Sequence, residues 1–217
     1  MTISDKHMTN PPQLLRRQAL AGLAATIVMT PYLANAATEQ QELLKRATLT
    51  LNATQNDAQF GTVRNVMQRA VAVMVVPQLI KGGFIVGGEG GDAVLLTRSA
   101  SGKFENPRFY FLASVSLGLQ IGLEVSEVVL CVMSQRALQA WAKDEVKLGA
   151  KAGLTVLVVG TSAEAAATTN ANVDVIAWAR SKGAYGGITL EGSVIKARDE
   201  WNREYYGRPV PRLVGVR

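Results

Sequence analysis

A glycine-rich stretch offers the first chemistry to consider. Residues 88–93 read Gly-Glu-Gly-Gly-Asp-Ala and fit the G-x-G-x-x-G/A pattern of dinucleotide-binding loops. Such a loop needs a helix N-terminus directly after it, because free N–H groups and the helix dipole hold the pyrophosphate. Residues 93–97 instead form a β pattern, Ala-Val-Leu-Leu-Thr. We therefore expect no nucleotide or other cofactor, and we assign the glycines to a sharp hairpin turn with close backbone approach.

Serine, cysteine and histidine chemistry is also disfavoured. Ser193 and Lys196 match the S-x-x-K motif, but in a predicted strand this odd spacing sends the two side chains to opposite faces. Cys131, the only cysteine, stands between apolar residues and is expected to be a buried, inert thiol. The only histidine, His7, lies in an N-terminal segment that we expect to be removed. We therefore expect neither a Ser-His-Asp or Cys-His site nor a metal site.

Carboxylates are the catalytic chemistry that stays open. Glu89, Glu124 and Glu191 each stand in a Gly-containing turn between predicted strands, and Gln120 shares the polar face of a strand with Glu124. Hairpins repeated around one curved sheet would bring these four residues to a polar cleft, which favours a carboxylate enzyme as one alternative. The other interpretation is that most acidic side chains are solvated or form surface ion pairs.

The first 36 residues have the pattern of an export signal. Arg16 and Arg17 precede the apolar run 19–29, and Ala34-Asn35-Ala36 is a small-x-small cleavage site. The run is shorter than the roughly 20 residues that span a bilayer. The paired arginines resemble a twin-arginine signal, although the general secretory route stays an alternative. We expect cleavage near Ala36, a single domain over residues 37–217, and a periplasmic or envelope-associated location.

Hydrophobic periodicity predicts both helices and strands. Thr38 and Gln41 form a capping box at the start of a helix over residues 38–51. Trp201 and Tyr205, four residues apart on the last helix, are expected to anchor it to the core. Further helices are expected at residues 62–70, 134–143 (with Ser134 as cap) and 199–206, and strands at 71–76 (ended by Pro77), 114–125 (one long strand), 127–133, 154–159, 173–179 and 184–196 (a hairpin). The fold class is therefore α+β, with a strongly curved, mainly antiparallel sheet or partly open barrel, N-terminal amphipathic helices and short additional helices.

Basic residues mark the two N-terminal helices. The net charge of +6 is mild for the length and excludes a typical nucleic-acid-binding composition. An amphipathic helix with basic flanks can lie on an anionic membrane surface. The alternative is an ordinary solvated polar face. The basic residues in or just after these helices are Lys45, Arg46, Arg64, Arg69 and Lys81.

Several motifs, in order, resemble the SYLF domain family, a lipid-binding domain also described as an actin-binding module in yeast. They are Val75-Val76-Pro77, residues 81–84 (KGGF), 87–91 (GGEGG), 118–125 (GLQIGLEV), 180–183 (RSKG), 190–194 (LEGSV) and 205–208 (YYGR). The resemblance covers about residues 40–209.

The resemblance implies a non-enzymatic domain that binds phospholipids through basic residues and an N-terminal amphipathic helix. By position, it makes Lys45, Arg46, Arg64, Arg69 and Lys81 the candidate lipid contacts. Export would separate the chain from actin, so we expect anionic phospholipids as the partner and not actin. A structural role in an assembly is a further alternative, and neither the lipid nor the oligomeric state follows from the sequence.

Overall fold

A computed structural model describes residues 30–56, 61–83, 86–117, 122–149, 151, 153–159, 173–181, 190–207, 210 and 213. Contacts divide the chain into two compact units, Met1–Asn35 and Ala36–Arg217, and the second unit carries the fold. The predicted leader lies outside the described residues except from Thr30 onward. None of the described helices has both the length and the apolar character needed to cross a bilayer.

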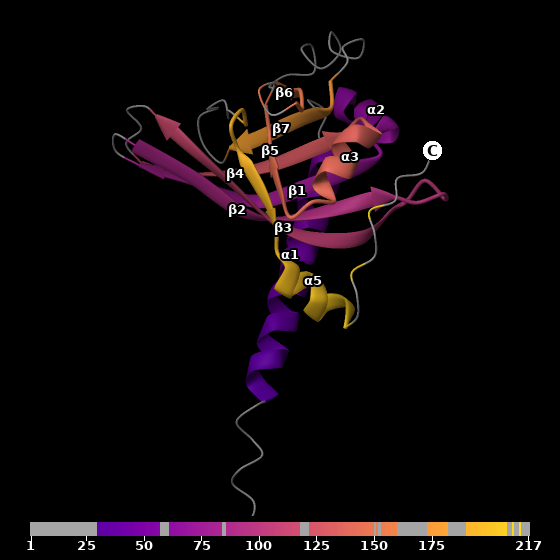
Figure 1. The fold of residues 1–217 in the computed structure, drawn as a ribbon, viewed down its shortest axis with the longest axis vertical. Coiled ribbons are helices and arrows are strands. Elements are labelled where there is room, and N and C mark those ends of the chain that lie inside the picture. Colours follow the sequence, from indigo (N-terminus) through magenta and orange to yellow (C-terminus); the bar gives the residue numbers. More distant parts are fainter. Residues whose placement is uncertain are drawn as a thin grey trace, which may run out of the picture. The chain divides into compact units, whose positions relative to one another are not determined.

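Eight strands form one sheet in the order β5-β8-β3-β2-β1-β4-β7-β6 (Figure 1). All neighbouring strands are antiparallel except β6 and β7. The elements are α1 (Thr30–Asn56), α2 (Gly61–Arg69), β1 (Ala72–Gly83), β2 (Val86–Arg98), β3 (Phe104–Leu117), β4 (Gly122–Val132), α3 (Gln135–Trp141), β5 (Glu145–Lys147), β6 (Val156–Val159), β7 (Val175–Ser181), β8 (Val194–Ala197) and α5 (Asp199–Tyr206). This half-barrel with an N-terminal helix and short helices confirms the predicted α+β class.

The two faces of the sheet carry separate apolar cores. On one face, here the α3 face, Met74, Leu112 and Leu130 pack with Trp141 of α3. On the opposite face, the α1 face, buried side chains of β1, β2, β3 and β4 pack against α1 and α2. They are Val73, Val75, Val94, Phe109 and Cys131, packed with Ala47, Val66 and Met67. Side chains alternate between faces along a strand, and in β1 the alternation reverses between Val76 and Leu79, which both belong to the α3 face.

The predicted start of the first helix is wrong. The helix begins at Thr30, and Thr38 lies inside it, so no capping box forms there. Pro31 suits the first turn of a helix, and the alanine-rich segment after it has high helix propensity. A local capping pattern could not reveal that the preceding residues continue the helix.

Pro77 does not end β1, contrary to the prediction. The strand continues to Gly83, and its pairing with β4 shifts register between Val76 and Leu79. A bulge tolerates a residue that has no N–H to give to the ladder. The bulge therefore extends β1 to the part of the sheet where the candidate site lies.

Residues 114–125 are not one strand, as their alternation predicted. Leu117 ends β3 and Gly122 begins β4, with β2 and β1 lying between these strands in the sheet. Period-two alternation occurs in both strands and does not show where the chain turns. The interpretation of residues 87–91 as the hairpin turn is also wrong, because they lie inside β2.

Close approach of a neighbouring group, backbone at Gly91 and a side chain at Gly90, does explain two glycines of this stretch. A Cβ on Gly91 would lie 2.4 Å from the carbonyl oxygen of Gln78, and a Cβ on Gly90 would lie 2.9 Å from the Phe111 ring. Neither glycine has a positive φ, since the described residues with positive φ lie elsewhere. Glycine is required at these two positions because there is no space for a side chain, and not because the backbone conformation demands it.

Candidate functional site

A row of polar side chains crosses the α3 face where the apolar core ends. Lys81 of β1 pairs in register with Glu89 of β2 on one side and with Glu124 of β4 on the other. Glu89 in turn pairs with Ser114 of β3. We call Ser114, Glu89, Lys81 and Glu124 the polar row. The structure thus brings two of the predicted cleft carboxylates to one row, about 10 Å apart with a lysine between them.

Glu89 is the member of the polar row whose pKa is shifted. Its side chain is buried, with 6% of the residue exposed, and its Oε2 has no hydrogen-bond partner. Burial raises the pKa of Glu89, and the charge of Glu124 adds to this, whereas Lys81 and a hydrogen bond with Ser114 lower it. The sum of these effects is a raised pKa, because desolvation outweighs the neighbouring lysine.

The other predicted members of the cleft are not brought to the polar row. Glu191 is exposed in the turn before β8, where its side chain lies against Gly149. Gln120 lies outside the described residues. Among the described residues, no three His, Cys, Asp or Glu side chains gather as metal ligands. The S-x-x-K alternative also finds no support, because Ser193 is buried and Lys196 exposed.

We expect Glu89→Gln to stabilise the protein by about 1 kcal/mol at pH 8. An acid whose pKa is raised by folding contributes stability below its unfolded pKa and loses that contribution as pH rises through the folded pKa. The gain of glutamine over glutamate should therefore disappear toward pH 4. Urea denaturation at several pH values measures this, with the exposed Glu105→Gln as control. A variant that is less stable at pH 8 would mean that Lys81 needs the Glu89 charge.

The predicted basic residues fall into two places. Lys45 and Arg46 are exposed on α1, and Arg64 and Arg69 are exposed on α2. Arg64 donates to the backbone oxygen of Gln55 (2.8 Å), which ties the start of α2 to the end of α1. Lys81 is half-buried in the polar row, on the other face of the sheet. Four of the five basic residues thus lie on adjoining helices, and Lys81 is apart from them.

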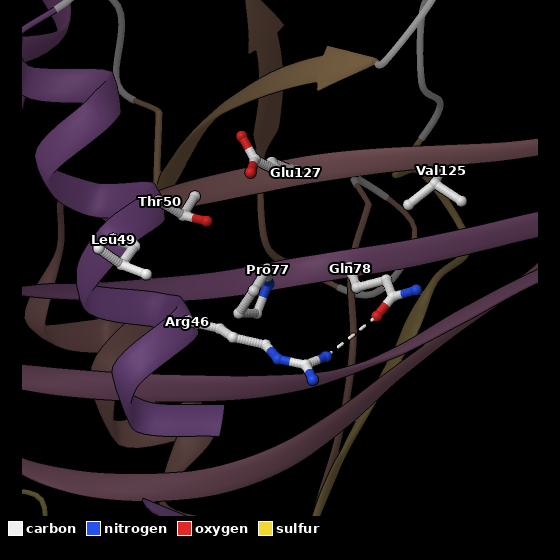
Figure 2. Close-up of a pocket in the computed structure, with 7 residues that line it drawn as sticks. All are labelled: Arg46, Leu49, Thr50, Pro77, Gln78, Val125 and Glu127. Carbon is white, nitrogen blue, oxygen red and sulfur yellow. Dashed lines mark hydrogen bonds between the residues drawn. The ribbon is translucent and has the colours of Figure 1, made fainter. Parts of the chain in front are cut away.

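Two pockets lie where α1 meets the sheet, one on each side of Arg46. The first, of about 320 Å³, is shown in Figure 2, where Arg46 reaches from α1 toward Gln78 of β1. Its Nη1 donates to Oε1 of Gln78 (3.4 Å), and its Nε donates to Glu42 (3.2 Å). The second pocket, of about 360 Å³, is lined by Arg46, Ile80 and Phe111 among others. The sequence did not indicate these pockets, because they depend on how α1 crosses the strands.

The remaining charges around these pockets are mutually paired. Glu127, in the first pocket, forms an ion pair with Arg180, and Asp92, in the second, forms one with Arg198. Lys45 and Arg69 form no ion pair with another described residue. The α1 and α2 surface therefore carries cations that are free to meet an external anion.

The amino-acid sequence of this chain is similar to sequences of known proteins. Residues 113–213 match the family model described as "Ysc84: Las17-binding protein actin regulator". SH3 domain-containing YSC84-like protein 1 of Xenopus laevis is 33% identical over 136 residues, which are 62% of this chain and 41% of that protein. The human protein of the same name is 31% identical over 134 residues, 61% of this chain and 39% of that protein.

A yeast protein gives a similar match. LAS seventeen-binding protein 3 of Saccharomyces cerevisiae is 31% identical over 146 residues, which are 66% of this chain and 32% of that protein. The matches cover between 32% and 41% of the length of these relatives. The matches show that this chain is similar to proteins of the Ysc84 family, and they agree with the resemblance seen in the sequence.

Proposed function

We propose that this chain is an exported module that binds anionic phospholipids at a membrane surface of the cell envelope. The observation that carries this proposal is the set of exposed cations on α1 and α2, in a chain whose motifs resemble the lipid-binding SYLF domain. Lysine and arginine near an anionic bilayer each contribute about 1 kcal/mol of attraction.

Lipid is the better partner for this chain than actin. The leader pattern of residues 1–36 motivates export, by the twin-arginine or the general route, and export would keep the chain from a cytoskeleton. Fractionation of cells that produce the chain tests this location directly. A chain retained wholly in the cytosol would remove the reason for preferring lipid over actin.

The lipid proposal predicts that two exposed cations act at the membrane. We expect Lys45→Gln with Arg69→Gln to weaken binding to anionic vesicles by about 2 kcal/mol, or roughly thirtyfold. Neither side chain makes an ion pair with another described residue, so the fold should be unaffected. Co-sedimentation of residues 37–217 with phosphatidylcholine vesicles, with and without phosphatidylglycerol, measures the effect.

A matched control removes the same charge elsewhere. Lys143 and Lys147 are also exposed, after α3 and in β5, and Lys143→Gln with Lys147→Gln should leave binding unchanged. Binding should also weaken as salt rises, because exposed charges are screened. Equal losses in both double variants would show that only net charge matters, and binding that ignores phosphatidylglycerol would contradict the proposal.

A further inference from the structure

The α1 face of the sheet is only partly covered by helices. Beyond α1, three apolar side chains on this face are exposed: Ile80 of β1 (43%), and Phe111 and Val115 of β3 (40% and 77%). They alternate with residues of the α3 face, such as Leu79 and Leu112, which are buried. We call Ile80, Phe111 and Val115 the open apolar face.

Part of this face lies where the outer strands β3 and β4 have no neighbouring strand among the described residues. β8 pairs with β3 only from Tyr110 to Ala113, so residues 114–117 of β3 have no described strand beyond them. On the other side, the described pairing of β7 with β4 runs from Ser126 to Val132. Val115 therefore lies on a four-stranded extension of β3, β2, β1 and β4, whereas Ile80 and Phe111 lie at its base, where β8 still pairs with β3.

Because glycines occupy the β2 positions between Ile80 and the residues of β3, no side chain of β2 separates the apolar residues of this surface. Gly90 pairs with Ile80 on one side and Ala113 on the other, and the Phe111 ring lies over it. Gly88 pairs with Val115, yet a Cβ there would meet only the oxygen of Ser114, at 3.8 Å. Packing inside the molecule thus explains Gly90 but does not require a glycine at position 88. A flat apolar strip of this kind suits a partner that lies on it from outside.

Arg46 borders this surface, and its ion pair with Glu42 one turn earlier on α1 is exposed and therefore weak. Arg46 lines the pockets on both sides of the α1–sheet junction, and Ile80 and Phe111 line the second pocket with it. The neighbouring acids Asp92 and Glu127 are neutralised by Arg198 and Arg180. Leu49, 60% exposed on α1, adds an apolar side chain next to Arg46 in the first pocket. A cation beside exposed hydrocarbon is complementary to a lipid with an anionic headgroup and apolar chains.

We propose that the open apolar face is the surface that enters the acyl region of an anionic bilayer, with Arg46 at the level of the lipid phosphates. This inference rests on the proposed function and assigns it a second contact surface besides the cations of α1 and α2. A membrane is the expected occupant because the Arg46 charge and the exposed apolar side chains lie side by side. A soluble anion would use Arg46 but would leave Ile80, Phe111 and Val115 in water.

A single labelled position tests this contact in the full chain. Cys131 is fully buried, so a cysteine introduced by Val115→Cys can carry a nitrobenzoxadiazole label selectively. We expect its fluorescence to shift to the blue with phosphatidylglycerol-containing vesicles and to be quenched by lipids spin-labelled on the acyl chain. The same label at Lys147→Cys, on exposed β5, should remain unquenched.

Unlabelled variants give a second, independent measurement. Val115→Ser should weaken binding to phosphatidylglycerol vesicles about tenfold, because the valine side chain that enters the bilayer is replaced by a polar serine side chain. It should leave thermal unfolding unchanged, since Val115 is 77% exposed. Arg46→Gln should reduce the preference for phosphatidylglycerol over phosphatidylcholine.

The outcomes separate this inference from the proposed function. Vesicle binding without quenching at Val115→Cys, or with equal quenching at Lys147→Cys, overturns the inference and leaves the lipid-binding proposal standing. A blue shift without vesicles, together with a dimer mass in solution, would show that a second copy covers the face and would also overturn it. No binding to any vesicle would contradict both.

Discussion

Asp174→Ala is expected to lower the free energy of unfolding by about 3 kcal/mol, because it removes a buried carboxylate that satisfies three donors. Ser134 Oγ donates to Oδ1 (2.6 Å), the backbone N–H of Thr155 donates to Oδ2 (3.0 Å), and the Arg136 guanidinium donates to both oxygens. Asp174 thereby joins the start of α3 to the entries of β6 and β7. Urea denaturation at pH 7 measures the loss.

The pH dependence of this effect has a defined sign. Burial alone would raise the pKa of Asp174, but the hydrogen bonds from Ser134, Thr155 and Arg136 together lower it. A depressed carboxyl pKa stabilises the protein above the unfolded value of about 3.8, and this stability is lost as pH falls through the folded pKa. The difference between wild type and Asp174→Ala should therefore narrow below pH 4.

Two comparisons make this prediction specific. Asp144→Ala removes an exposed carboxylate at a turn and should change stability by less than about 0.5 kcal/mol. Ser134→Ala should reproduce part of the Asp174→Ala loss, because it removes one of the three donors to Asp174. It should add the cost of the α3 cap, in which Ser134 accepts from the N–H of Ala137 (3.1 Å). A loss in Asp174→Ala that stays constant down to pH 2 would show that packing, and not the carboxylate charge, is responsible.

Features that depend on neighbouring residues were predictable from the sequence. The Ser134 cap is confirmed because serine before a helical apolar pattern acts within three residues along the chain. The burial of Cys131 is confirmed because both its neighbours in β4 are apolar. The mainly antiparallel sheet followed in the same way from the alternation of apolar and polar residues.

Features set by strand register could not be predicted. The partners of Glu89 are Ser114 and Lys81, but only the pairing of β2 with β3 and β1 shows this. The alternating run 114–125 contributes to two strands, β3 and β4, that are not neighbours in the sheet. Glu124 therefore joins the polar row by pairing with Lys81 of β1, and not by lying in the same strand as Ser114. Likewise, the acceptor for the Ser134 hydroxyl is 40 residues away along the chain.

The last helix shows the same division between local and long-range information. Trp201 and Tyr205 contact the Phe109 ring edge-on, at 6.0 and 5.2 Å between centroids, which confirms them as anchors of α5. Nothing in the sequence distinguishes Asn202, which is fully buried on the same helix. On a short helix rich in charged residues, the sequence does not distinguish a buried polar residue from a polar residue exposed to solvent.

Asn202 acts as an additional strand residue for β3. Its Oδ1 accepts from the Phe109 N–H (2.7 Å), and its Nδ2 donates to the Phe109 carbonyl oxygen (3.0 Å). The last residue of β8, Ala197, pairs with Tyr110, so the amide continues the ladder one residue beyond that strand. Arg198 N–H also donates to the Phe109 oxygen (2.9 Å). The Phe109 N–H is thus the group that depends on Asn202.

Asn202→Ala is expected to cost about 3 kcal/mol, since it leaves the buried Phe109 N–H without an acceptor. Asn202→Asp provides the sharper comparison, because an aspartate accepts from that N–H but its charge repels the Phe109 carbonyl oxygen. This variant should be destabilised at pH 7 and recover part of the loss at pH 4, where the protonated acid donates. Hydrogen exchange of the Phe109 amide should accelerate in Asn202→Ala, while exchange at Val75, in the middle of the sheet, follows global stability alone. Unchanged Phe109 exchange, or equal stability of Asn202→Ala and the exposed Glu200→Ala, would contradict this role for Asn202.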